Sequence, residues 1–80
     1  MEHKVEFFYG TKNAILRLSD TELGQLRKNS TWNNRNVENS TYGTIDNVAI
    51  HSLLELNKEY SRFTKVFPFH EYEKIYWEII

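Results

Sequence analysis

The sequence predicts an α+β protein in which an N-terminal β-hairpin and one or two C-terminal strands form an antiparallel sheet, packed by one long and one short helix. Two alternating apolar runs around a glycine-containing turn open the chain, which indicates a hairpin. Apolar residues in the middle of the chain recur every three or four positions, as in an amphipathic helix. Because 80 residues form one small core, we expect a single domain over residues 1–80.

The hairpin is predicted over residues 4–19, with a four-residue turn at residues 10–13. This turn places six apolar residues on one face of the ribbon and leaves the other face mainly polar, because side chains alternate along a strand. One pair on the polar face is apolar, since Phe8 would lie opposite Ile15. The other predicted pairs are Tyr9 with Ala14, Phe7 with Leu16, Val5 with Leu18, Glu6 with Arg17 and Lys4 with Ser19.

A short helix over residues 20–28 is predicted from the residues at its start. Ser19 and Glu22 have the spacing of a capping box, in which each side chain accepts a hydrogen bond from the backbone N–H group of the other residue. Leu23 and Leu26 would then lie on the side of the helix that faces the sheet.

Residues 29–43 are rich in Asn, Ser and Thr, which predicts a loop, and loops of this length are often functional. Trp32 could stack there on an unpaired base. The cations that would neutralise phosphates beside it are Arg27, Lys28 and Arg35. Alternatively, Trp32 folds back over the sheet and closes the core, because its large apolar ring stabilises small proteins when it is buried.

A long helix is predicted over residues 44–61, with Thr44 as its N-cap. The apolar residues from Ile45 to Phe63 follow spacings of three and four positions, which place them on one stripe. Further apolar residues beside that stripe widen the apolar side of the helix. We therefore expect this helix to pack across the sheet as the central element of the core.

The C-terminal segment predicts two short strands around a bend at Pro68, because proline interrupts both strands and helices. In the second strand, residues 74–80, apolar and polar side chains alternate. The alternation puts Ile75, Trp77 and Ile79 on one face and Lys74, Tyr76 and Glu78 on the other. A helix with Tyr72, Ile75, Tyr76 and Ile79 on one side is the alternative interpretation.

The composition argues against several classes of function. Ten Lys and Arg residues against eleven Asp and Glu residues give a net charge of −1, which disfavours a general nucleic-acid binder. The absence of cysteine excludes disulfides and cysteine-bound zinc. No apolar run approaches the roughly 20 residues that span a bilayer, and the N-terminus lacks the apolar core of a signal peptide. We therefore expect a cytoplasmic protein without a cofactor and without membrane contact.

The three histidines are the best candidates for catalysis. His51 and His70 could form an acid–base pair while Arg62 holds a phosphate, which is the minimal equipment of a metal-independent nuclease. Their spacing matches no catalytic motif, and the carboxylates beside His70 are too few to hold a metal. We therefore expect no enzyme activity and keep a small nuclease as the third hypothesis.

An excess of aromatic residues is the main functional signal. Two Trp, five Tyr and five Phe residues are more than one small core easily buries, and Tyr and Trp often anchor protein interfaces. We therefore predict a non-enzymatic protein that binds a macromolecule, either a host or cognate protein or a second copy in a homodimer. The predicted partner-binding residues are Phe8, Ile15, Arg27, Lys28, Trp32, Arg35, Tyr42 and Tyr76.

The biological setting is predicted by analogy. Asn, Ile, Lys and Tyr, all encoded by AT-rich codons, are abundant, as in proteins of phages and mobile elements with AT-rich genomes. Small proteins of that kind often inhibit or modulate a host protein. The alternative is a nucleic-acid-binding regulator that uses the loop at residues 27–42. Its affinity would fall steeply with salt, whereas that of an aromatic protein interface would change little.

Overall fold

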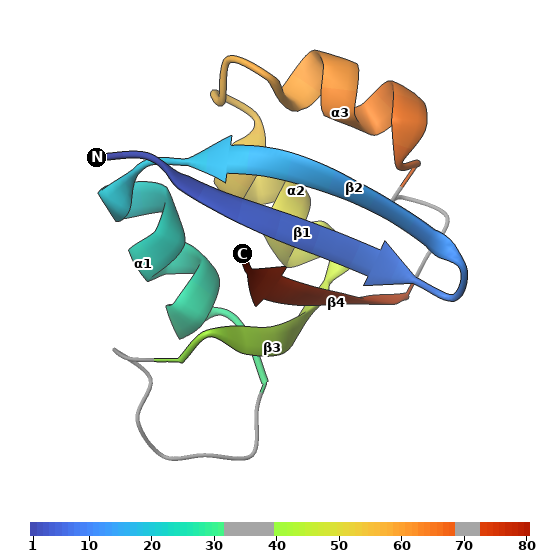
Figure 1. Ribbon diagram of the computed structural model, residues 1–80, viewed down its shortest axis with the longest axis horizontal. Coiled ribbons are helices and arrows are strands. Elements are labelled where there is room, and N and C mark those ends of the chain that lie inside the picture. Colours follow the sequence, from blue (N-terminus) through green and yellow to red (C-terminus); the bar gives the residue numbers. More distant parts are fainter. Residues whose placement is uncertain (32–39, 69–72) are drawn as a thin grey trace.

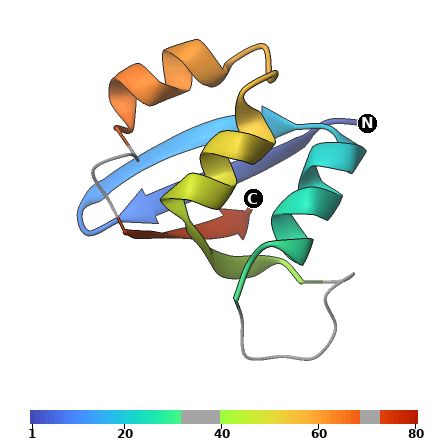
Figure 2. The same cartoon turned by 180° about the vertical axis from the view of Figure 1, so that it is seen from behind.

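The computed structural model of the protein describes residues 1–31, 40–68 and 73–80. In these residues, three helices cover one face of a four-stranded antiparallel sheet (Figures 1 and 2). The predicted α+β class is therefore confirmed, and the strand order across the sheet is β2-β1-β4-β3. The elements are β1 (His3–Tyr9), β2 (Lys12–Leu18), α1 (Asp20–Lys28), β3 (Tyr42–Asp46), α2 (Asn47–Leu54), α3 (Tyr60–Val66) and β4 (Lys74–Ile79).

The N-terminal hairpin forms as predicted, but its predicted register is wrong by two residues. A two-residue turn at Gly10 and Thr11 joins β1 to β2, and the φ angle of Gly10 is 60°. Glycine with positive φ at the first turn position is typical of type II′ turns, whose twist matches that of the strands. A shift by two preserves the alternation, so each side chain keeps its predicted face. The observed pairs include Phe8 with Asn13, Glu6 with Ile15, Lys4 with Arg17, Val5 with Leu16 and Phe7 with Ala14.

Helix α1 matches its prediction at both ends. The Ser19 hydroxyl accepts a hydrogen bond from the Glu22 N–H at 3.2 Å, and the Glu22 carboxylate accepts one from the Ser19 N–H at 2.8 Å. The helix ends at its C-cap, Asn29. Leu23 and Leu26 are buried in the core, so the apolar side of the helix is also the predicted one.

The predicted long helix over residues 44–61 is wrong, because its first residues belong to strand β3. Ile45 is paired with Ile75 of β4 and is buried on the inner face of the sheet. On the other edge of β3, Thr44 exchanges two backbone hydrogen bonds with Thr31. Helix α2 starts only after this strand. The apolar spacing from Ile45 onward therefore combines a buried strand residue with a helix.

A turn between α2 and α3 interrupts the rest of the predicted helix. The Asn57 side-chain oxygen accepts a hydrogen bond from the Glu59 N–H at 2.8 Å, an Asx turn that competes with helical hydrogen bonding. The Asn57 amide nitrogen lies 3.0 to 3.2 Å from the Arg17 carbonyl oxygen and the Glu22 carboxylate, to which it donates. Contacts with distant parts of the chain therefore help to fix the position of the break.

Strand β4 confirms the predicted alternation at the C-terminus. Ile75 and Trp77 are fully buried, whereas Tyr76 is exposed. The Trp77 indole N–H donates a hydrogen bond to the Ser30 hydroxyl at 2.7 Å, which satisfies its polar group inside the core. The predicted strand before Pro68 is wrong, because helix α3 occupies that segment.

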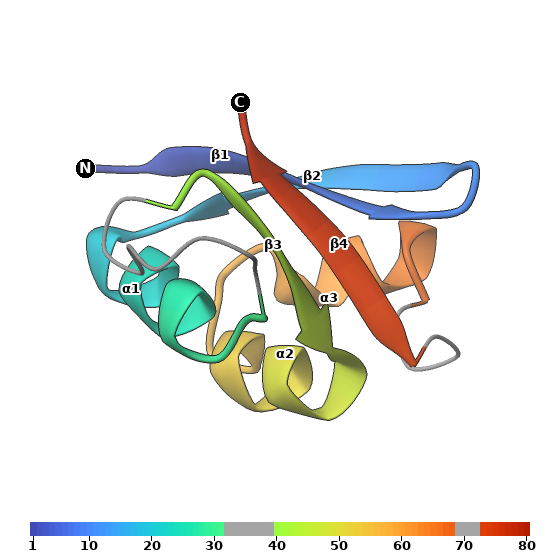
Figure 3. The ribbon, with the colours of Figure 1, turned by 90° about the horizontal axis from the view of Figure 1, so that it is seen from below.

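The core lies between the inner face of the sheet and the three helices (Figure 3). Phe7 of β1 and Phe63 of α3 meet edge to face, with ring centroids 5.3 Å apart, so the two layers are packed directly against each other. In the described part of the chain, no helix covers the other side of the sheet. We call this side the open face.

Candidate functional site

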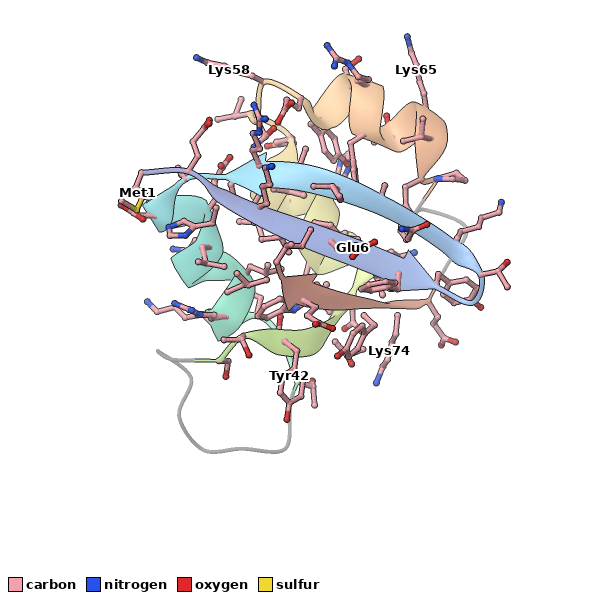
Figure 4. The ribbon with its side chains drawn as sticks, in the orientation of Figure 1. Met1, Glu6, Tyr42, Lys58, Lys65 and Lys74 are labelled. Atoms are coloured by element: carbon pink, nitrogen blue, oxygen red, sulfur yellow. The ribbon has the colours of Figure 1, made fainter. Side chains whose placement is uncertain are left out.

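The open face presents alternate residues of all four strands. Glu6 lies near its centre, and Tyr42 and Lys74 lie toward the side formed by β3 and β4 (Figure 4). The strands come from both ends and the middle of the chain, so this surface exists only in the folded protein. The strand register places on it Lys4, Glu6, Phe8, Asn13, Ile15, Arg17, Tyr42, Thr44, Asp46, Lys74, Tyr76 and Glu78.

Three aromatic rings form a continuous strip across the open face. The ring of Tyr76 in β4 lies 5.6 Å from that of Phe8 in β1 and 6.4 Å from that of Tyr42 in β3, measured between centroids. Tyr76 is 40% exposed and Tyr42 is 42% exposed. We call Phe8, Tyr76 and Tyr42 the aromatic strip. The strip therefore combines the half-buried phenyl ring of Phe8 with two exposed phenol rings.

Two carboxylates lie beside the aromatic strip, because Glu6 of β1 is directly opposite Glu78 of β4. Like charges directly opposite in a sheet destabilise the pairing. Among the described residues, neither carboxylate forms an ion pair, although the Asn13 side-chain amide donates a hydrogen bond to Glu6. The other charged residues of the open face are Lys4 opposite Arg17 and Lys74 opposite Asp46. Positive and negative charges are therefore equal in number on this face.

The hydroxyl of Tyr76 interacts with the neighbouring carboxylate of Glu78. Partial burial raises the pKa of Tyr76, and the negative charge of Glu78 raises it further. The hydroxyl also donates a long hydrogen bond to the Glu78 carboxylate, at 3.5 Å. Tyrosine is neutral at pH 7 even at its ordinary pKa of about 10, so Tyr76 contributes a hydrogen-bond donor as well as an apolar ring.

The fold brings four of the eight predicted binding residues to one surface. Phe8, Tyr42 and Tyr76 form the aromatic strip, and Ile15 of β2 is 54% exposed on the same face. The predicted cross-strand pair of Phe8 and Ile15 is wrong, since Ile15 lies opposite Glu6. The two residues instead lie diagonally on neighbouring strands, about 7–8 Å apart at the backbone.

The two described basic residues that were predicted to bind nucleic acid, Arg27 and Lys28, do not belong to the open face. Arg27 lies on α1, in the helical layer, and its Nε–H donates a hydrogen bond to the Ser40 carbonyl oxygen at 2.8 Å. Lys28 is exposed at the end of the same helix. Trp32 and Arg35 lie outside the described residues, so neither interpretation of Trp32 is tested.

Of the three predicted nuclease residues, His51 and Arg62 lie in the described part of the chain, so the predicted acid–base pair is not tested. The His51 Nδ1 atom forms a hydrogen bond with the Tyr60 hydroxyl at 2.6 Å, which connects α2 to α3. Burial, followed by the charge of Glu55, raises the pKa of Tyr60. Arg62 is exposed on α3, and His70 lies outside the described residues. His51 therefore has a structural contact that explains its position.

Other candidate features lead to no site. Within residues 1–31, 40–68 and 73–80, no group of three or more His, Cys, Asp or Glu side chains is placed to hold a metal. None of the helices in these ranges is both long and apolar enough to cross a membrane. A hollow of about 510 Å³ lies beside the end of β2, where Glu22 and Glu59 accept hydrogen bonds from Asn57 and from the Arg17 N–H. These hydrogen bonds join β2 and α1 to the turn between α2 and α3, so we assign the hollow a structural role.

Comparison with protein families, with curated proteins and with solved structures gave no match. The candidate site is therefore defined by its geometry. Sequence reasoning missed the opposition of Glu6 and Glu78 and the strand that carries Tyr42. The alternation in residues 42–45, where Gly43 and Ile45 are buried and Tyr42 is exposed, could have indicated that strand.

Proposed function

We propose that this protein is a non-enzymatic binding protein that docks a partner protein on its open face through the aromatic strip. The observation that carries the proposal is the meeting of Phe8, Tyr76 and Tyr42, from three different strands, on a face that no helix of the described residues covers. Contiguous exposed apolar surface is characteristic of interaction sites, and tyrosine commonly anchors protein interfaces.

The charge of the open face favours a protein over a nucleic acid as the partner. Glu6 and Glu78 lie beside the rings. There they would repel the phosphate groups of a nucleotide whose base stacks on the strip. A nucleic-acid-binding regulator that uses the loop at 27–42 stays the second hypothesis. In this hypothesis Arg27 already donates a hydrogen bond to the Ser40 carbonyl oxygen. Of the loop's predicted phosphate-binding cations that the structure describes, Lys28 is the exposed one.

The biological role that fits such a surface is inhibition or modulation of a host protein by a phage or mobile-element protein. This part of the proposal rests on the small size of the chain and on its richness in Asn, Ile, Lys and Tyr. It is an analogy with other small binding proteins. A homodimer through the open face is the competing use of the same surface.

A capture experiment with a matched control tests the proposal. Lys65 is exposed on α3 and points away from the sheet (Figure 4). Since the chain has no cysteine, Lys65→Cys gives a single site for biotin and immobilisation. Wild type, Tyr76→Thr and Tyr9→Thr would be exposed to extract of the source cells, with and without nuclease. Tyr9 is a 45% exposed tyrosine at the end of β1 and outside the strip.

We expect wild type and Tyr9→Thr to retain the same protein and Tyr76→Thr to lose it, because threonine keeps the strand propensity but removes the ring. Nuclease should not change the result. Equal retention by Tyr76→Thr would contradict the proposal. Loss of the partner after nuclease treatment would support the nucleic-acid hypothesis instead.

A further inference from the structure

We infer that the partner presents an arginine side chain to the open face, where the guanidinium group lies over the aromatic strip and bonds to the carboxylates of Glu6 and Glu78. This inference rests on the proposed function and specifies the chemistry of the partner. The occupant is therefore an arginine-bearing segment of another protein.

Negative charge lies beside the aromatic strip. Glu6 and Glu78 are directly opposite on the two central strands, and neither has an ion pair among the described residues. The Asn13 side-chain amide donates a hydrogen bond to one carboxylate oxygen of Glu6, at 2.5 Å, but the amide carries no charge. Lys4 lies two positions along β1, roughly 7 Å away at the backbone. A cation from a partner would therefore relieve a repulsion that the free protein retains.

The aromatic rings lie next to these two carboxylates along the strands. Tyr76 precedes Glu78 by two positions in β4, and Phe8 follows Glu6 by two positions in β1, so a ring and a carboxylate are adjacent on both strands. Tyr42 lies directly opposite Glu78 from β3. A cation held by the carboxylates is thus within reach of ring faces, where it gains a cation–π interaction.

Carboxylates and aromatic rings side by side favour arginine over lysine as the bound cation. A guanidinium group is planar and stacks on aromatic rings while its N–H groups bond to carboxylates in a fork. A lysine ammonium is a strongly hydrated point charge and makes no such stack. Phosphate groups are disfavoured here, because two carboxylates occupy the place where a cation would be needed.

The test is a titration with a defined peptide, followed by nuclear magnetic resonance of the backbone amides. The probe is acetylated and amidated tetra-arginine, compared with tetralysine and tetraglutamate of the same length. We expect saturable shifts for tetra-arginine at Glu6, Phe8, Tyr76 and Glu78. Tetralysine should bind more weakly, tetraglutamate should not bind, and added salt should weaken binding.

The double variant Glu6→Gln/Glu78→Gln should bind tetra-arginine about tenfold more weakly, because two exposed ion pairs are lost. The matched control is Glu55→Gln/Glu73→Gln, which removes the same charge from two exposed residues outside the strip. The control should bind like the wild type. Loss of the Glu6–Glu78 repulsion should leave the first variant at least as stable as the wild type, so a folding defect would not explain its weaker binding.

The inference would be overturned by equal binding of the Glu6→Gln/Glu78→Gln variant, by equal weakening in the matched control, or by shifts confined to another surface. Binding of oligothymidylate to the strip, or a dimer that Tyr76→Thr dissociates, would also contradict it. If tetra-arginine fails while Tyr76→Thr still abolishes capture of a protein, the proposed function stands and only the arginine specificity is wrong.

Discussion

Single residues at the start of α1 fix the point at which the chain leaves the sheet. Ser19 and Glu22 satisfy two backbone N–H groups that otherwise have no partner at a helix start. Asp20, the first residue of the helix, accepts a hydrogen bond from His3 of β1 through its carboxylate. The same carboxylate lies 3.5 Å from the Met1 ammonium group. These contacts lie at the surface, so substitutions there should change stability without altering the core.

The first prediction is that Ser19→Ala lowers the free energy of unfolding by roughly 0.5–2 kcal/mol, because the helix loses its side-chain acceptor. Urea unfolding followed by circular dichroism would measure the change. Ser19→Asn keeps an acceptor and should stay close to the wild type. An unchanged unfolding midpoint for Ser19→Ala would mean that the capping box does not stabilise α1.

The second prediction concerns the pH dependence of stability. The hydrogen bond from His3, followed by the Met1 ammonium group, lowers the pKa of Asp20. A carboxyl whose pKa is depressed in the folded state stabilises the protein above its unfolded pKa of about 3.9, and loses this effect as the pH falls through the folded pKa. Asp20→Asn should therefore be less stable than wild type at pH 7, and the difference should disappear in acid. A difference that persists at the lowest pH would contradict this account.

At the level of elements, sequence patterns correctly predicted the features that depend on residues close together in the chain. The capping box of α1 and the alternation of β4 are properties of neighbouring residues, and both were predicted correctly. Strand β3 was missed because its pairing with β4 and its bridge to Thr31 join segments far apart in sequence. The break after α2 likewise depends on Asn57 contacts with Arg17 and Glu22, which no spacing of apolar residues encodes. The hairpin register was predicted wrongly, because a two-residue turn and a four-residue turn place the same side chains on the same faces. The alternation of apolar residues therefore could not distinguish the two turns.

A third prediction follows for the turn between α2 and α3. Asn57→Ala should lower the free energy of unfolding by roughly 1–3 kcal/mol, since it removes hydrogen bonds to a carbonyl and to a carboxylate in a half-buried position. The neighbouring exposed residue provides the control, because Lys58→Ala should change stability by less than about 0.5 kcal/mol. Equal effects of the two substitutions in urea unfolding would show that Asn57 does not anchor this turn.

At the scale of the whole molecule, one face of the sheet holds the core and the other carries the candidate site. The sequence indicated an aromatic surplus, and the fold collects Phe8, Ile15, Tyr42 and Tyr76 on the open face. The opposition of Glu6 and Glu78 could not be predicted, because the sequence does not reveal that β4 inserts beside β1. The basic set around Trp32 was grouped by sequence proximity, and its member Arg27 lies in the helical layer.

A fourth prediction tests this division of the sheet. The chain has two tryptophans, so Trp32→Phe leaves Trp77 as the only one. Because Trp77 is fully buried on the inner face, the variant should show blue-shifted emission that resists quenching by acrylamide. Unfolding in urea should shift the emission to the red and remove the protection. Red-shifted, freely quenched emission from the folded variant would place Trp77 outside the core.

The central claim is that a partner protein docks on the open face, and site-specific photo-cross-linking tests it most directly. A benzophenone amino acid would replace Tyr42 of the aromatic strip in one variant and Val66 of α3, an exposed residue of the helical layer, in another. After irradiation in extract of the source cells, we expect a nuclease-resistant adduct with a protein from position 42 and none from position 66. An adduct from position 66 alone, or a nucleic-acid adduct from position 42, would contradict the claim.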